Sequence, residues 1–153
     1  MNINDLLEIS ASICPERKGF IYKNNSLTFG ELQTEVLSFS NILLNLGVKN
    51  GDRIFYFHTN TVDWVKIVFA ACNIGAVVVP INYRSKAEEL EFMLNDSNPN
   101  IIFAGTRYHD LIDSAISKSN CKPICVSIDD EFSDPWLGIN NLDNTYNSLM
   151  ESD

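Results

Sequence analysis

Two histidines and four cysteines are the side chains of this sequence best suited to metal binding or nucleophilic catalysis. No HExxH or GxSxG motif is present, so the patterns of zinc proteases and serine hydrolases are absent. Cys121 and Cys125 do not have CxxC spacing, and Cys72 and Cys125 lie in apolar patterns typical of small buried hydrophobes. We therefore expect four free thiols, in the core or at the surface, and no catalytic or metal-ligating residue.

Two polar positions follow expected strands, where parallel sheets commonly bind ligands. His58 comes directly after the apolar run 53–57, although a helix-capping or surface imidazole is the simpler interpretation. Asp129 and Asp130 follow another apolar run and suggest a Mg²⁺ site. A phospho-receiver would carry further acidic residues after its first strand and at the end of its third. Ala104 ends the third strand here, so the acidic pair is expected to begin a solvated loop.

Phosphate-binding and nucleic-acid-binding patterns are also missing. The sequence contains neither GxxxxGK[ST] nor a GxGxxG between a strand and a helix. Its formal charge is −9, and its 11 basic residues are scattered, which argues against a general nucleic-acid partner.

The elements that must position any site begin with an extended hairpin and a helix. Two short extended segments in 20–29 are joined by Asn24 and Asn25, which favour a turn. Thr28 and Glu31 form a capping-box pattern, and an apolar stripe at helical spacing follows. Gly47 is placed to end this helix in a left-handed conformation.

Four strands are expected after this helix: 53–57, 76–81, 101–104 and 124–128. Helices alternate with them over 64–74, from 87 onward and over 108–116, with Asn60 and a box of Ser85 and Glu88 as the expected caps. The strand 76–81 is continuously apolar, which is typical of a strand buried inside a parallel sheet.

This alternation predicts an α/β fold: a three-layer, flavodoxin-like open parallel sheet with helices on both faces and a small N-terminal extended hairpin. A single domain over 1–153 is expected, with an acidic loop and a short helix in 129–153. The N-terminus lacks the pattern of a signal peptide, and no apolar run is long enough for a membrane span. We therefore expect a cytoplasmic location.

Five stretches in order resemble one family: LTFGEL (27–32), LGVKNGDRI (46–54), NTVDWV (60–65), ACNIGAVVVPINYR (71–84) and AEELEFMLNDS (87–97). They are similar to the N-terminal subdomain of the AMP-forming adenylate-forming enzymes. The NYR ending and the Glu-Glu-Leu helix resemble the acyl-CoA synthetase branch.

The resemblance implies an ATP-dependent, AMP-forming carboxylate– or fatty acid–CoA ligase, which uses Mg²⁺, ATP and CoA. In that branch the region of Asn82, Tyr83 and Arg84 is similar to a surface near the nucleotide end of CoA, and Arg84 would pair with a CoA phosphate. The alternative role for Arg84 is bracing the following helix or a partner domain.

The family's phosphate loop, ribose-binding aspartate and C-terminal lysine lie downstream of the matched stretches. We therefore expect 129–153 to lead into an ATP-binding core that this sequence lacks, and the fragment to be catalytically incomplete, with no tightly bound cofactor. Its partners would be the remainder of its own chain and, in the parent, a carboxylic acid and CoA. A free-standing, non-enzymatic binding domain derived from the family is the alternative.

Overall fold

The computed structural model describes residues 2–142 of the chain. These residues form two compact units: those up to Asn50 together with Asn60–Ala76, and Gly51–Thr59 together with the described residues from Val77 onward. The first unit holds the hairpin and three helices, and the second holds the parallel sheet. The expectation of a single domain over 1–153 stays a prediction.

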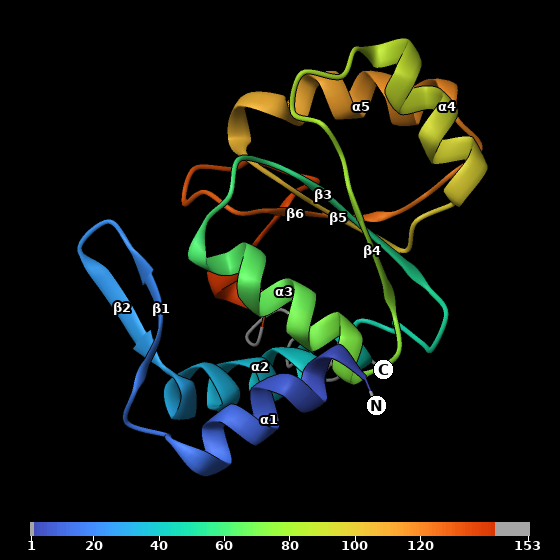
Figure 1. The fold of residues 1–153 in the computed structure, drawn as a ribbon. Coiled ribbons are helices and arrows are strands. Elements are labelled where there is room, and N and C mark those ends of the chain that lie inside the picture. The colour runs from blue at the N-terminus through green and yellow to red at the C-terminus, as the bar shows by residue number, and fades with distance from the viewer. Residues whose placement is uncertain (1, 143–153) are drawn as a thin grey trace. The chain divides into compact units, whose positions relative to one another are not determined.

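The first unit contains α1 (Ile3–Ile13), β1 (Lys18–Tyr22), β2 (Asn25–Thr28), α2 (Phe29–Asn45) and α3 (Val62–Asn73). The strands β1 and β2 pair antiparallel, and their turn lies at Lys23 and Asn24, one residue earlier than the expected pair. Within this unit α1 lies along α2 and α3 (Figure 1). The sequence reading missed α1, whose buried Leu7 and Ala11 face its neighbours.

The ends of α2 follow the sequence closely. The Glu31 main-chain N–H donates to the Thr28 hydroxyl at 3.2 Å, and the Thr28 N–H donates to the Glu31 carboxylate at 2.8 Å. Gly47 has a φ of +86°, and the Val48 N–H donates to the Leu43 carbonyl at 3.0 Å. The predicted capping box and glycine stop are thus confirmed. The cap of α3 is Thr61 rather than Asn60.

The second unit holds a five-stranded sheet whose neighbouring strands all run parallel, in the order β4-β3-β5-β6-β7. Its elements are β3 (Arg53–Phe57), β4 (Val77–Pro80), α4 (Ala87–Ser97), β5 (Ile101–Ala104), η1 (Thr106–Tyr108), α5 (His109–Lys118), β6 (Ile124–Ser127), β7 (Leu137–Gly138) and η2 (Ile139–Asn141). Numbered along the chain, this is the 2-1-3-4-5 order of flavodoxin-like folds. The predicted α/β class is confirmed, and β7 is an addition that the sequence reading missed.

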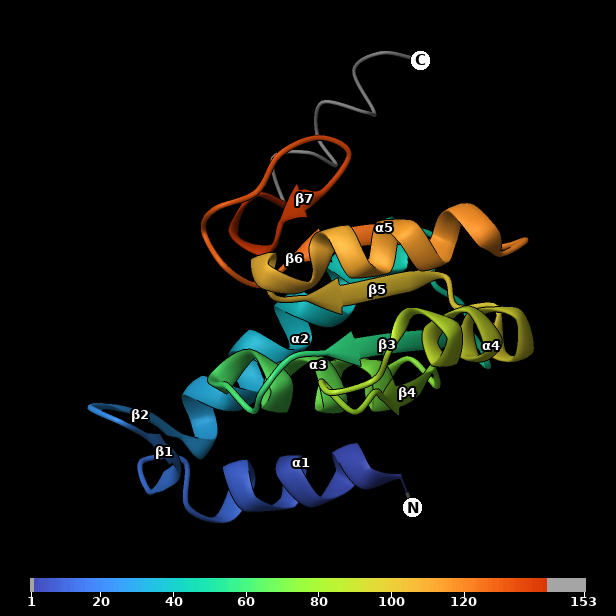
Figure 2. The same cartoon turned by 90° about the horizontal axis from the view of Figure 1, so that it is seen from above.

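One face of this sheet is covered by α4 and α5, which lie side by side (Figure 1 and Figure 2). Phe55, Phe57 and Ile102 project from the sheet into a core with residues of the two helices, and the helix residues are Leu90, Leu94, Ile112 and Ala115. Side chains that project from the other face of the sheet, such as Ile54 and Phe103, are also fully buried. Burial on both faces explains why these strands read as continuous apolar runs.

The valine strand β4 lies at the edge of the sheet as far as the described residues show, and not in its interior. The N–H groups of Val77 and Ile81 point toward β3, donating to Asp52 and Tyr56 carbonyls at 2.7 and 2.9 Å. The residues that alternate with these along the strand, Pro80 among them, therefore have their backbone groups directed away from β3. A proline lacks an N–H, so it is tolerated at this position and typical of an edge strand. The apolar run alone did not reveal this.

Two further details concern α4. Its capping box lies one residue later than the predicted box of Ser85 and Glu88: the N-cap is Lys86, whose N–H donates to the Glu89 carboxylate at 2.8 Å. At the other end the Arg53 guanidinium donates to the Ser97 and Asn98 carbonyls at 2.6 and 3.2 Å. A cation there is favourable for the helix dipole and ties the start of β3 to α4.

The short helix expected near the C-terminus lies outside the described residues. Within the described part of the chain, no helix is both long and apolar enough to cross a membrane.

Candidate functional site

The strand order fixes where a ligand site is expected in the second unit. From β3 the chain continues to β4 on one side of it, whereas from β5 it continues to β6 on the other. The carboxyl ends of β3 and β5 therefore form the switch point of the sheet, where open α/β sheets commonly bind ligands. His58 follows β3 directly, and Gly105 and Thr106 follow β5.

A shallow hollow of about 600 Å³ opens at this edge. Its walls come from the ends of three strands, and its lining residues are His58, Thr59, Thr106, Arg107, Asp129, Asp130 and Glu131. The sequence reading noted His58 and the acidic pair but missed Thr106, Arg107 and Glu131. The signal for them was that they, too, follow buried apolar strands.

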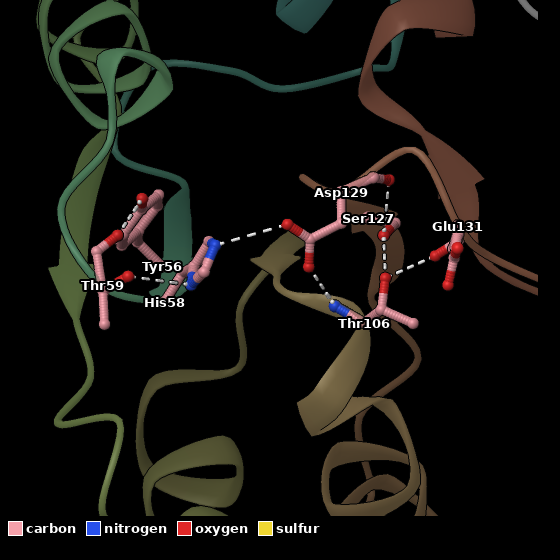
Figure 3. Close-up of polar contacts among 7 residues, drawn as sticks. All are labelled: Tyr56, His58, Thr59, Thr106, Ser127, Asp129 and Glu131. Carbon is pink, nitrogen blue, oxygen red and sulfur yellow. Dashed lines mark hydrogen bonds and ion pairs between the residues drawn. The ribbon is translucent and has the colours of Figure 1, made fainter. Parts of the chain in front are cut away.

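Asp129 lies at the centre of the contacts in the hollow (Figure 3). One carboxylate oxygen, Oδ2, accepts the main-chain N–H of Thr106 at 2.8 Å. The other, Oδ1, lies 3.6 Å from Nε2 of His58, whose side chain is only 12% exposed. A single carboxylate thus joins the segments that follow β3, β5 and β6.

Gly105 makes this close approach possible. A Cβ atom there would lie 3.1 Å from the Asp129 carboxylate and 3.2 Å from the His58 ring. Both distances are tighter than ordinary van der Waals contact, so any larger residue would push these groups apart. Without a Cβ at Gly105, neither side chain has to shift by the few tenths of an ångström that a larger residue would demand.

The hydroxyl groups of the cluster are occupied in bracing the loops. The Thr106 hydroxyl donates to the Glu131 carbonyl and lies 3.4 Å from the Ser127 hydroxyl, which donates to the Asp129 carbonyl at 3.1 Å. On the other side of the hollow, the Tyr56 hydroxyl donates to the Thr59 carbonyl at 2.9 Å (Figure 3). The Ser127 hydroxyl bonds to the main chain, whereas the Thr59 hydroxyl lies 3.4 Å from Nδ1 of His58, whose other ring nitrogen faces Asp129 (Figure 3).

The acidic pair does not act as a chelate either. Asp130 accepts from the Asn140 amide at 3.1 Å, whereas Asp129 bonds to Thr106. Among residues 2–142 there is no group of three or more histidine, cysteine, aspartate or glutamate side chains arranged to hold a metal ion. The two aspartates of the hollow thus hold its loops in place.

Asn82, Tyr83 and Arg84 lie together in an exposed turn after β4, and they do not line the hollow. The Asn82 side chain accepts the Arg84 N–H at 3.0 Å, and the Asn82 carbonyl accepts the Ser85 N–H at 2.9 Å. The Arg84 guanidinium lies over the Tyr83 ring, 5.4 Å from its centre. In the described part of the chain it forms no ion pair with α4, so the guanidinium is available to an anion.

Relatives of known type resemble the chain over most of its length. A long-chain-fatty-acid–CoA ligase, FadD13 of Mycobacterium tuberculosis, is 28% identical over 143 residues, which cover 92% of this chain and 27% of that protein. A 3-oxocholest-4-en-26-oate–CoA ligase of Rhodococcus rhodochrous is 25% identical over 130 residues, which cover 85% of this chain and 23% of that protein. The chain thus spans about a quarter of the length of these curated relatives.

Solved structures share the fold. The N-terminal domain of FACL13 from Mycobacterium tuberculosis superimposes with a TM-score of 0.76 at 26% identity, over 97% of this chain and 36% of that one. The anthranilate CoA ligase AuaEII, solved with anthranoyl-AMP, gives a TM-score of 0.88 at 23% identity. The match covers 95% of this chain and 28% of that one. The model of the AMP-binding enzyme family matches residues 7–148. On this match, and with the order of elements described above, the chain belongs to the AMP-binding enzyme family.

Proposed function

We propose that this chain is the N-terminal part of an ATP-dependent, AMP-forming carboxylate–CoA ligase. The observation that carries the proposal is the family match over residues 7–148, together with relatives that are named as CoA ligases. In such an enzyme the carboxylate attacks the α-phosphate of ATP, which forms an acyl-adenylate and releases pyrophosphate. The CoA thiol then displaces AMP to give the acyl-CoA thioester.

The described residues do not fit a Mg·ATP site. The sequence has no glycine-rich phosphate cradle, and its described residues contain no metal-binding cluster. The chain's proposed contribution is therefore to build the scaffold and to offer a CoA-side surface. ATP, Mg²⁺ and the carboxylic acid would be bound mainly by the rest of the parent enzyme.

The CoA-side surface is proposed to be the turn of Asn82, Tyr83 and Arg84. Its support is the free, exposed guanidinium of Arg84, which is held over an aromatic ring at the carboxyl edge of the sheet. A guanidinium pairs with phosphate through two parallel hydrogen bonds. The adenine-nucleotide end of CoA carries such phosphates. The competing role, bracing of α4 or a partner domain, predicts a change in stability instead.

The gene sequence beyond codon 153 is the first test. A long open reading frame with a Ser/Thr/Gly-rich phosphate loop supports the proposal, and an immediate stop codon favours a free-standing binding domain. Pyrophosphate release with a panel of fatty and aromatic acids is the second test. The long protein should turn over, and ATP-dependent turnover by residues 1–153 alone would contradict the incomplete-fragment proposal.

The role of Arg84 can be tested in the long protein. Arg84→Ala should raise KM for CoA while leaving acyl-adenylate formation unchanged, because adenylate formation precedes CoA binding. Arg17→Ala is the control, since Arg17 is also exposed and does not line the hollow. Equal effects of the two changes would show that general surface charge, and not Arg84, is responsible. A lower melting temperature with normal CoA kinetics would favour the bracing role.

A further inference from the structure

A buried aromatic stack connects the loop after β6 to α5. The Trp136 ring lies parallel to the His109 ring, with their centres 3.7 Å apart and an angle of 7° between their planes. Trp136 is 2% exposed and His109 is 8% exposed. The indole N–H also donates to the two carboxylate oxygens of Asp113 at 3.1 and 3.3 Å. Trp136 therefore anchors segment 129–138 to α5 by one ring face and a hydrogen bond shared between the two oxygens of Asp113.

The histidine of this stack has a nitrogen with no partner. Its ring forms a hydrogen bond with the main chain of Ala104. Nε2 is buried and has no hydrogen-bond partner among the residues that the structure describes. A neutral imidazole tolerates this arrangement, because only a lone pair is left unsatisfied. A protonated ring would place a charged N–H donor where nothing accepts it, at a substantial cost.

We propose that Trp136 and His109 form an acid-sensitive latch, which holds segment 129–138 on α5 and opens when His109 takes up a proton. The proposal is independent of the proposed CoA ligase activity.

The charges around His109 set the direction of the effect. Burial lowers the pKa of His109, and the carboxylates of Asp113, Asp129 and Asp110 oppose this without reversing it. A lowered pKa means that the closed latch binds the proton less well than the open one. Its stabilisation is therefore complete above the pKa of the exposed imidazole, and it is lost as the pH falls through the lower value.

His58 acts in the opposite sense. Protonation of His58 would strengthen its pairing with Asp129, at 3.6 Å, and so hold the same segment at its other end. Opening is therefore expected to begin near Trp136 and not at Asp129. Because Asp129, Asp130 and Glu131 line the hollow, release of the segment would reshape that hollow.

Trp136 supplies its own probe. In a Trp64→Phe background it is the only tryptophan, because the sequence contains two. Between about pH 8 and about pH 5, where histidines titrate, acrylamide quenching should rise several-fold and the emission maximum should shift to longer wavelength. Far-UV circular dichroism should stay constant over the same range. A local latch would be contradicted if acrylamide quenching of Trp136 stayed low at acid pH. It would also be contradicted if the far-UV ellipticity were lost over the same pH range.

Three variants separate the groups. His109→Gln should abolish the transition, and persistence of the transition at the same pH would overturn the role of His109. Asp113→Asn keeps an acceptor for the indole but removes a charge that favours the protonated ring, so the midpoint should move to lower pH. A midpoint that does not move in the Asp113→Asn protein would also count against the latch. This second variant keeps the proposal testable if the His109→Gln protein does not fold. His58→Gln removes the contact with Asp129 that holds the other end of the segment, so the Trp136 transition should persist with its midpoint at the same or a higher pH. Loss of the transition in this variant would assign it to His58.

Discussion

At the scale of single residues, the chain separates positions that shape the backbone from those that join distant segments. Gly47 and Gly75 end helices with φ angles of +86° and +76°, which only glycine adopts without strain. Their role can be read from neighbouring residues. Asp129 joins the ends of strands that lie far apart in sequence, and no local pattern indicates that pairing.

Gly75→Ala should destabilise the chain more than Gly47→Ala. Both changes place an alanine in the left-handed region, at a cost of about 1 kcal/mol. A Cβ at Gly75 would also collide with the Asn50 side-chain amide, whereas a Cβ at Gly47 meets no atom within 4 Å. Urea unfolding measures the difference, and Asn50→Ala should recover part of the loss in the Gly75→Ala protein only. Equal losses in the two single variants would show that Asn50 moves away without cost.

Cys125 should resist alkylation in the folded chain. Burial, aided by the charge of Asp113, raises the pKa of its thiol to about 12. At pH 8 only about one molecule in ten thousand then carries the reactive thiolate, against roughly a quarter for an ordinary cysteine. Iodoacetamide labelling followed by mass spectrometry should show slow modification of Cys125 without urea and fast modification with it. Fast labelling without urea would mean that this part of the sheet opens readily.

At the scale of elements, helix caps are local and sheet positions are not. The box of Thr28 and Glu31 is confirmed because its partners lie three residues apart, on one turn. The edge position of β4 depends on which strand pairs with which, and the valine run is compatible with either place. Pro80 was the residue that could have decided it, because proline is rare in central strands.

Thr28→Ala should lower the free energy of unfolding by about 1 kcal/mol, the usual effect of losing an N-cap hydroxyl. Hydrogen bonds from the Thr28 main chain, and then its side chain, lower the pKa of Glu31. That stabilisation is present above the ordinary carboxyl pKa and is lost as the pH falls through the lower value. Glu31→Gln should therefore weaken the chain at neutral pH and flatten its acid-induced loss of stability. The free energy of unfolding, measured against pH by urea unfolding, gives the test. Parallel curves for the Glu31→Gln protein and the unchanged protein would refute the role of the carboxylate.

Pro80→Val should leave the sheet's own hydrogen bonds intact, because this position points away from β3. It would add an N–H donor to an apolar edge strand, so we expect more self-association, measured by light scattering. Val79→Pro is the matched change at the neighbouring position, whose backbone faces β3. It removes a hydrogen bond to β3 and should lower the free energy of unfolding more than Pro80→Val does. If the two changes had similar effects on stability, the assigned backbone directions would be wrong.

At the scale of the whole molecule, charge and length bound what the chain can do. The formal charge is −9, from 20 acidic and 11 basic residues. A labelled DNA duplex at low salt should show no rise in fluorescence anisotropy with this protein, because phosphate binding needs clustered cations. Binding that weakens as salt is added would contradict this. A basic DNA-binding domain, which should bind under the same conditions, serves as the control.

The sequence by itself determined the elements with local signals, the α/β class and the family, because capping pairs, helical stripes and motif order are written along the chain. The tertiary structure alone decided the edge position of β4, the added strand β7, and the meeting of His58 with Asp129 and of His109 with Trp136. The physical reason is that these features depend on strand order. Strand order is set by how apolar faces are buried together, and no single segment records it.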